Sequence, residues 1–158
     1  MARFSTTLQT GAPAQPALDH LADFATVADW DPGISEATLI AGEPGRVGAR
    51  YRVVASFGPR RIPLVYEVRE RVDPFDGAAG HVVLFAESGS FTSLDTITVT
   101  PEESGSQVRY DAVLTLKGVG RVMDWPLHLS FQVIGRRAEQ GLRAWLAGLA
   151  VAQGTRPE

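Results

Sequence analysis

Three polar side chains fall at positions where the sequence predicts inward-facing residues of β-strands: Tyr66, Asp95 and Tyr110. Asp95 is in register with four apolar or small residues of its predicted strand, so it faces inward if that strand is regular. These four residues are Phe91, Ser93, Ile97 and Val99. A buried carboxyl or phenol group needs a hydrogen-bond partner, which a ligand hydroxyl or carbonyl group could supply. An apolar cavity would raise the pKa of Asp95, which suits general acid–base chemistry.

A structural role is the alternative for each of these three residues. Asp95 could lie near an end of the sheet and pair with an arginine or with the backbone. Tyr66 and Tyr110 could be ordinary core residues whose hydroxyl groups reach the rim of the core. The residue types therefore mark candidates for proton transfer and leave both roles open.

The sequence offers no convincing phosphate-binding, metal-binding or serine-hydrolase motif. Gly42, Gly45 and Gly48 resemble a phosphate-binding loop only loosely, because no Gly-Lys-Ser/Thr follows and the segment leads into a strand. Turn geometry explains these glycines. The histidines are dispersed among different predicted elements without metal-ligand spacing; they are His20, His81 and His128. The sequence contains no G-x-S-x-G motif, and we expect neither a bound metal nor another cofactor.

The composition is typical of one globular domain: 158 residues, of which 44% are hydrophobic and 21% charged. A net charge of -3 and the lack of any Lys/Arg block argue against nucleic-acid binding. The absence of cysteine excludes disulfides and thiolate catalysis and suits a reducing cytoplasm. No window approaches the ~18–20 apolar residues that cross a bilayer, and the first ten residues lack a signal-peptide pattern. We expect a soluble, cytoplasmic protein without membrane insertion.

Hydrophobic periodicity predicts the elements that position the candidate residues. Residues 3–10 alternate like a strand, and residues 16–27 form one or two short helices that end before Pro32. Six further strands are predicted at 35–41, 49–57, 61–72, 81–87, 91–100 and 107–116. The short links between them favour an antiparallel sheet with one apolar and one wet face. The strand at 81–87 is apolar on both faces, so its orientation stays open.

After Gly118 the period becomes helical. The apolar stripe contains Leu127, Phe131, Ile134, Ala138, Leu142, Trp145 and Leu149. We expect this helix to begin near residues 118–121, with Pro126 either bending it or marking its true start. The predicted class is α+β: a seven-stranded, curved antiparallel sheet wrapped around a long C-terminal helix, with two short helices after the first strand. Residues 1–150 form a single domain, and residues 151–158 form a disordered tail.

Local segments agree with a known family. "LADFATVADWDPGISEATL" contains an aromatic turn with Trp30, Asp31 and Pro32, and "GEPGRVGARYRV" is a glycine-rich connection into a strand. "LVYEVRERVDP" is followed by an acidic, Thr-rich strand, "SLDTITVTP". Together with the element order, these segments resemble the START-like superfamily, also known as SRPBCC, over residues 3–149. The resemblance implies the helix-grip fold, which hosts lipid carriers, hormone receptors, aromatase/cyclases, ring-hydroxylase subunits and chaperone activators.

The resemblance also implies a ligand cavity between the concave sheet face and the C-terminal helix. Many inward side chains are small, so we expect a volume on the order of several hundred Å³. The ligand should lie under the start of the helix, between Gly118 and Pro126. The expected ligand-binding residues are Trp30, Val53, Ala55, Leu64, Tyr66, Val68, Ile97, Tyr110, Ala112, Leu114, Val122, Trp125 and Leu129.

Three functions remain open at this point. The first is non-catalytic binding of a hydrophobic or aromatic small molecule, such as a lipid or a polyketide. The second is a polyketide aromatase/cyclase-dehydratase that uses Asp95, Tyr66 and Tyr110 as proton handlers. The third is a protein-interaction module of toxin–antitoxin or chaperone-regulator type. For each function we expect a monomer or a homodimer.

Overall fold

The computed structural model describes residues 1–57, 59–118 and 124–154, including their side chains except at 57, 124–134, 153 and 154. Strands and helices follow one another in the order that the sequence periodicity predicts. In chain order they are β1 (Ala2–Thr10), α1 (Ala14–Ala22), the 3₁₀ turn η1 (Phe24–Thr26), α2 (Val27–Trp30), β2 (Ile34–Ala41), β3 (Arg50–Phe57), β4 (Arg60–Val72), β5 (Gly80–Glu87), β6 (Phe91–Glu102), β7 (Gly105–Leu116) and α3 (Asp124–Gly154).

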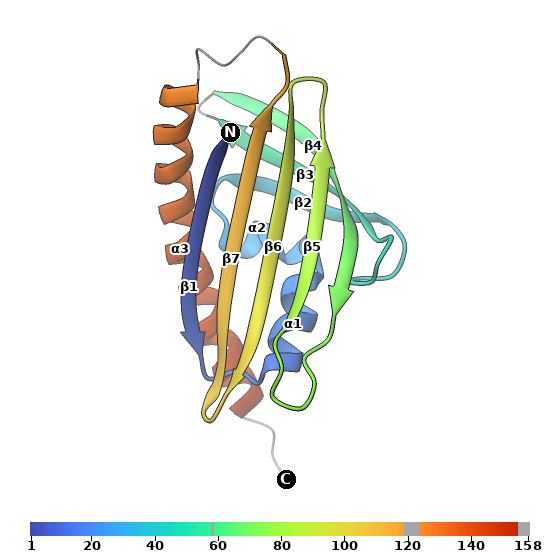
Figure 1. Cartoon of the computed structure of the whole chain (residues 1–158), viewed down its shortest axis with the longest axis vertical. Helices are drawn as coiled ribbons and strands as arrows, with labels where there is room; N and C mark the ends of the chain where they lie inside the picture. The colour runs from blue at the N-terminus through green and yellow to red at the C-terminus, as the bar shows by residue number, and fades with distance from the viewer. Residues whose placement is uncertain (58, 119–123, 155–158) are drawn as a thin grey trace.

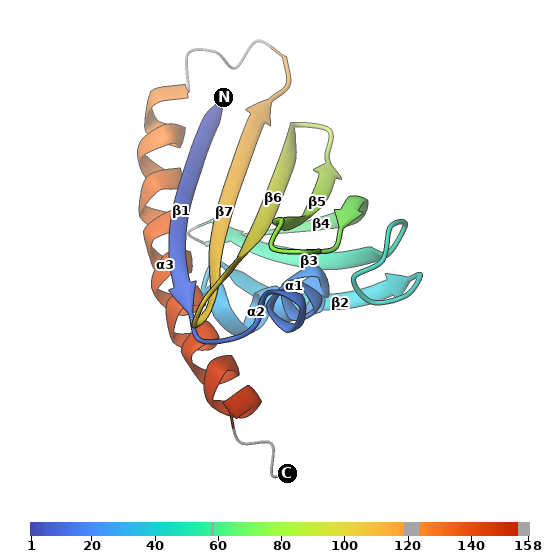
Figure 2. The same ribbon diagram turned by 60° about the horizontal axis from the view of Figure 1, so that its bottom comes forward.

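The seven strands form one antiparallel sheet in the order β1-β7-β6-β5-β4-β3-β2. Short turns join each strand from β2 to β7 to its neighbour, whereas β1 and β2 form the two opposite edges (Figure 1). The sheet curves strongly, and α3 runs beside β1 while α1 and α2 lie under the bend (Figure 2). The predicted curved sheet, short helices and long C-terminal helix are therefore confirmed.

Alternation along the strands gives the sheet one buried and one partly exposed face, as predicted. The orientation of β5, which the apolar sequence left open, is now clear. Val82, Leu84 and Ala86 are fully buried, while Val83 and Phe85 are half-buried on the outer face. The inward residues of β6 are Phe91, Ser93, Asp95, Ile97 and Val99, all of them buried.

The glycine-rich connection between β2 and β3 is a turn. Gly42, Gly45 and Gly48 have φ values of 80°, 69° and 88°, a region that L-residues rarely adopt. The backbone N–H of Gly45 donates a hydrogen bond of 2.7 Å to Oη of the buried Tyr51. These glycines therefore serve turn geometry, as the sequence predicts.

Arg71 connects this turn to α1. Its side chain is 6% exposed, and Nη1 donates a hydrogen bond of 2.9 Å to the carbonyl oxygen of Gly45. The guanidinium group also pairs with Asp19 of α1 and, at 2.7 Å, with Asp73. The buried guanidinium group of Arg71 thus joins the C-terminal end of β4, the glycine turn and α1.

The helix α3 differs from its prediction at both ends. Its first residue is Asp124, so Pro126 lies in the first turn, where a missing backbone N–H is tolerated. Gly118, where the helix was expected to begin, has a φ of 83° and is not helical, and the positions just after it lie outside the described residues. The helix continues to Gly154, into the segment that the sequence predicts as a tail beginning at residue 151. The last four positions lie outside the described residues.

The buried face of α3 contacts β1 and α2. Ala138, Leu142 and Leu146 are buried, while Trp145 and Leu149 are only partly buried. Leu146, which the predicted stripe omits, therefore lies on the inner face. Three stripe residues have side chains outside the described set: Leu127, Phe131 and Ile134.

Two glycines allow α3 to approach its neighbours closely. A Cβ atom on Gly141 would lie 1.8 Å from the backbone oxygen of Trp30, at the end of α2. A Cβ atom on Gly135 would lie 2.2 Å from Cδ2 of Phe4, on β1. Such distances are far below van der Waals contact, so neither position accepts a larger residue without movement.

Candidate functional site

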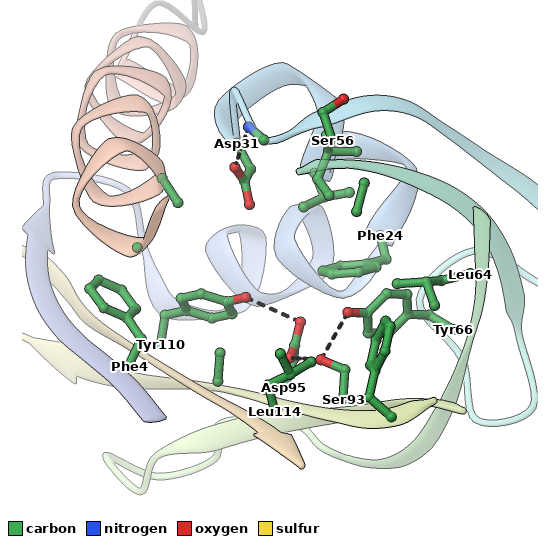
Figure 3. A pocket seen from close by; sticks show the side chains of 18 residues that line it. Phe4, Phe24, Asp31, Ser56, Leu64, Tyr66, Ser93, Asp95, Tyr110 and Leu114 are labelled. Carbon is green, nitrogen blue, oxygen red and sulfur yellow. Dashed lines mark hydrogen bonds between the residues drawn. The ribbon is translucent and has the colours of Figure 1, made fainter. Parts of the chain in front are cut away.

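A cavity of about 80 Å³ lies among the concave sheet face, the α2–β2 turn and α3 (Figure 3). Aromatic side chains from five different elements line it: Phe4, Phe24, Tyr66, Phe91 and Tyr110. The predicted volume of several hundred Å³ is too large for this structure, because these rings occupy much of the space under the sheet. The cavity is nevertheless concave and largely apolar, as small-molecule sites are.

A chain of hydrogen bonds crosses the sheet side of this cavity. Tyr66 Oη donates to Ser93 Oγ at 3.0 Å, and Ser93 Oγ donates to Asp95 Oδ1 at 3.1 Å. Tyr110 Oη donates to Asp95 Oδ2, also at 3.1 Å. All four residues are at most 7% exposed. The three candidate residues predicted from the sequence are thus brought together by one serine.

Strand register explains this arrangement. Ser93 and Asp95 are two residues apart on β6, so both point to the same face. On the neighbouring strand β7, Ala112 is the partner of Asp95, and the small side chain leaves room for Tyr110 to reach the carboxyl group. Tyr66 reaches Ser93 from β4, across β5.

Asp95 lies in the middle of β6, and its carboxyl group accepts hydrogen bonds from the neutral hydroxyl groups of Ser93 and Tyr110. The alternative expectation, a carboxylate near the sheet end paired with an arginine or with the backbone, is therefore wrong. Burial raises the pKa of Asp95 to about 7; hydrogen bonds from Ser93 and Tyr110 act to lower the pKa, and the charge of Asp31 raises it. A carboxyl group with this pKa both accepts and donates protons near neutral pH.

The two tyrosines are buried together with Asp95 instead of reaching the rim. Burial, and then the charge of Asp95, raise the pKa of Tyr66 and of Tyr110 well above 10. The ring of Phe24 lies 5.0 Å from that of Tyr66, centroid to centroid, and Trp30 meets Tyr110 edge-on at 5.7 Å. These contacts hold both phenols in place as neutral hydrogen-bond donors.

A second carboxyl group, Asp31, lines the cavity from the side opposite Asp95 (Figure 3). It follows α2 directly, and its Oδ1 accepts a hydrogen bond of 2.8 Å from the backbone N–H of Gly33. Burial raises the pKa of Asp31 to about 6, against the opposing effect of that hydrogen bond. The sequence reasoning placed Asp31 in a turn and gave it no chemical role.

The structure distributes the expected ligand-binding residues over three environments. Six of them line the cavity: Ala55, Leu64, Tyr66, Tyr110, Ala112 and Leu114. Four are fully buried in the core away from the cavity lining: Trp30, Val53, Val68 and Ile97. For three more, either the position or the side chain lies outside the described residues: Val122, Trp125 and Leu129.

Trp30, also expected to bind the ligand, belongs to the core. It is 1% exposed, packs against Tyr110, and is not among the described lining residues. The ligand was expected under positions 118–126, whereas the described contributions of α3 to the lining are Gly135 and Ala138, further along the helix. The side chains of the expected helix start lie outside the described residues, so the placement of the ligand there stays a prediction.

Sequence reasoning missed several lining residues besides Asp31. Phe4, Phe24, Phe91 and Ser93 all occupy inward positions of elements that were predicted correctly. Their periodicity therefore marked them as buried, but only the curvature of the sheet decides which buried residues meet at the cavity.

Within the described part of the chain, no group of three His, Asp or Glu side chains is arranged to hold a metal ion. No helix in that part has both the length and the apolar character needed to span a membrane.

Comparison with known proteins agrees with the geometry. The family model for polyketide cyclase/dehydrase and lipid transport proteins matches residues 1–151. No curated protein sequence is significantly similar to the chain.

Three solved structures illustrate the shared fold. TTHA0849 from Thermus thermophilus is 16% identical, with 98% of this chain and 99% of that chain covered and a TM-score of 0.69. A START superfamily protein from Mycobacterium smegmatis is 14% identical, with 92% and 97% covered and a TM-score of 0.70. The Zhui aromatase/cyclase from Streptomyces sp. R1128 is 12% identical, with 94% and 92% covered and a TM-score of 0.67.

At identities this low, the structural similarity shows a common fold and carries no information about function. The family model, by contrast, covers nearly the whole sequence. This chain therefore belongs to the polyketide cyclase/dehydrase and lipid transport family.

Proposed function

We propose that this protein binds a hydrophobic or aromatic small molecule in the cavity between the sheet and α3. One observation carries the proposal: five aromatic rings surround a cavity whose sheet side is a buried chain of four hydrogen-bonded polar groups. Apolar walls supply affinity, and a few fixed polar groups orient the ligand. Family membership is consistent with either ligand transport or polyketide chemistry.

The size of the cavity limits what enters without rearrangement. An apolar cavity of about 150 Å³ takes up benzene in another protein, whereas the cavity here measures about 80 Å³. A single aromatic ring therefore requires small movements of the lining rings, and a lipid or polyketide requires larger ones.

Binding of 2-naphthol, a neutral and fluorescent aromatic alcohol, tests the proposal. Ala112→Phe would fill the cavity from β7 and should abolish the fluorescence change that binding causes. Val113→Phe makes the same kind of change on the outer face of the same strand and is the matched control. Equal binding by the two variants would place the ligand outside the cavity. Native mass spectrometry of the purified protein would identify a ligand that copurifies with it.

Catalysis is a second candidate, favoured by the pKa of about 7 at Asp95. In this mechanism Asp95 exchanges protons with an enolisable polyketide. Once Asp95 is protonated, the hydrogen-bond chain can reverse, so that Tyr110 or, through Ser93, Tyr66 donates its hydroxyl proton to a substrate carbonyl oxygen. The fold shared with an aromatase/cyclase is compatible with such chemistry.

A synthetic aryl triketone tests catalysis, because aldol closure with loss of water forms an aromatic ring that absorbs in the ultraviolet. Asp95→Asn should abolish the turnover of this compound while leaving its binding nearly unchanged, since the neutral amide keeps the shape of the carboxyl group. An unchanged rate would remove Asp95 from the mechanism.

A further inference from the structure

The polar side of the cavity has its hydroxyl protons already in use. An ionised Asp95 only accepts hydrogen bonds, so Ser93 and Tyr110, which both contact it, must donate to it. Ser93 has a single proton, so Tyr66 must in turn donate to Ser93. When Asp95 is ionised, these groups therefore present lone pairs to the cavity and no free donor.

A second acceptor faces this chain of hydrogen bonds from the other side. The carboxyl group of Asp31 points into the cavity from the α2–β2 turn, toward Asp95 and Tyr110 (Figure 3). Asp31 is close enough for its charge to act on Asp95 and on both tyrosines. The cavity is thus bounded by two carboxyl groups on opposite sides.

No described side chain compensates this negative charge. Among the lining residues that the structure describes, none is lysine, arginine or histidine. The titratable groups that face Asp95 are Tyr66 from β4, Tyr110 from β7 and Asp31 from the turn. From β1 and α3 the described lining residues do not titrate: they are Phe4, Gly135 and Ala138.

We propose that the ligand carries a positively charged amine, which lies between Asp31 and Asp95, on an aromatic or apolar body that packs against the aromatic walls. This inference deepens the proposed function and rests on it. An ammonium group supplies donors to the hydroxyl and carboxylate lone pairs of this hydrogen-bond chain, and it neutralises the two facing carboxylates. The aromatic walls add cation–π attraction. A ligand carboxylate would instead meet two like charges.

The raised pKa values of Asp31 and Asp95, about 6 and about 7, provide an additional signature. An ammonium ion favours the ionised form of both groups, so its binding near pH 6.5 should release protons to the buffer. A neutral alcohol should release almost none.

Three probes with the same phenyl ring separate the head groups: 2-phenylethylamine, 2-phenylethanol and phenylacetate. Protein-detected NMR titrations at about pH 8, where both carboxyl groups are largely ionised, give the dissociation constants. We expect the amine to bind at least about tenfold more tightly than the alcohol, and the carboxylate to bind most weakly. Calorimetry of the amine in two buffers with different ionisation enthalpies measures the released protons.

Asp31→Asn tests the second carboxyl group, because asparagine keeps the oxygen that accepts the Gly33 hydrogen bond. The variant should lose about tenfold in amine affinity and almost nothing for 2-phenylethanol. Asp111→Asn, on the outer face of β7 and paired with Arg109, is the matched control and should change neither affinity.

The outcomes separate the two proposals. If the probes bind and the alcohol or carboxylate equals the amine, or if amine binding releases no protons, the amine inference is wrong and the binding function stands. If none of the three probes binds, the binding function falls together with the inference. The proton-release measurement uses the wild-type protein, so it decides the question even if Asp31→Asn does not fold.

Discussion

Replacing Asp95 with asparagine tests whether the buried carboxyl group destabilises the folded protein once it ionises. Asparagine has nearly the same shape but never carries a charge. Its amide group still offers an oxygen to Ser93 or Tyr110, whose hydroxyl groups can rotate to adapt. The variant therefore removes the charge and leaves the packing of the cavity nearly intact.

The expected size and sign follow from linkage. The pKa of Asp95 is raised from 3.8 in the unfolded chain to about 7 in the folded protein, so between these values the folded state holds the proton more tightly. Raising the pH through this range therefore lowers the free energy of unfolding, and the loss is complete above pH 7. Between pH 5 and pH 8, Asp95 titrates over about two pH units, so wild type should lose about 3 kcal/mol of its free energy of unfolding through this group. Asp95→Asn should not show this loss.

Urea unfolding gives the free energy of unfolding of wild type and of Asp95→Asn at about pH 5 and about pH 8. The change between the two pH values is then compared between the two proteins, so that groups that titrate alike in both cancel. Asp111→Asn is the control. Partial burial acts to raise the pKa of Asp111, but the hydrogen bonds from Arg109 outweigh it and the pKa is lowered, so its ionisation is complete in both states above pH 5. If wild type and Asp95→Asn differ in their free energy of unfolding by the same amount at both pH values, the pKa of Asp95 is not raised.

Four further substitutions test the packing of α3 and the contacts of Arg71. Gly141→Ala would place a methyl group 1.8 Å from the carbonyl oxygen at the end of α2, so thermal unfolding should show a loss of about 3 kcal/mol in the free energy of unfolding. Gly148→Ala, with nothing within 4 Å, should gain about 0.5–1 kcal/mol. Similar stabilities of the two variants would contradict the close approach of α3 to α2. Gly135→Ala should push the ring of Phe4 into the cavity and weaken 2-naphthol binding in the fluorescence titration, whereas unchanged binding would show that the ring turns elsewhere. Arg71→Met should cost about 2 kcal/mol in urea unfolding, and a cost near zero would mean that its ion pairs are fully compensated by water.

The elements of the fold could be predicted because each segment is locally consistent with its final environment. The alternation along β7 and β6 marked the inward residues correctly, since one face of the sheet is covered. The orientation of β5 could not be predicted, because its outer face also carries apolar residues such as Phe85, which lies under the guanidinium group of Arg69 at 5.2 Å. Leu146 follows Leu142 by four residues, so the helical period places both on the buried face of α3, although the predicted stripe continued through Trp145.

The candidate site was predictable only in part. Periodicity placed Asp95, Tyr66 and Tyr110 on one face, and the sheet brings all three together. Asp31 gave no such signal, because it lies in an irregular turn whose direction depends on how α2 packs under the sheet. The cavity volume could not be predicted from the sequence either, because it depends on the side-chain conformations of Phe4 and Phe24 as well as on residue sizes.

The strand order has a consequence for how the chain is made. β1 precedes the six other strands in the chain, yet it pairs with β7, the last of them, with Ala2 opposite Leu114. β2 meanwhile forms the opposite edge and pairs with β3 as soon as that strand is complete. We therefore expect the growing chain to assemble its sheet from the β2 edge, with β1 unpaired until the last strand is synthesised. Such long-range pairing slows folding, and until β7 is complete β1 is open to chaperones and to aggregation.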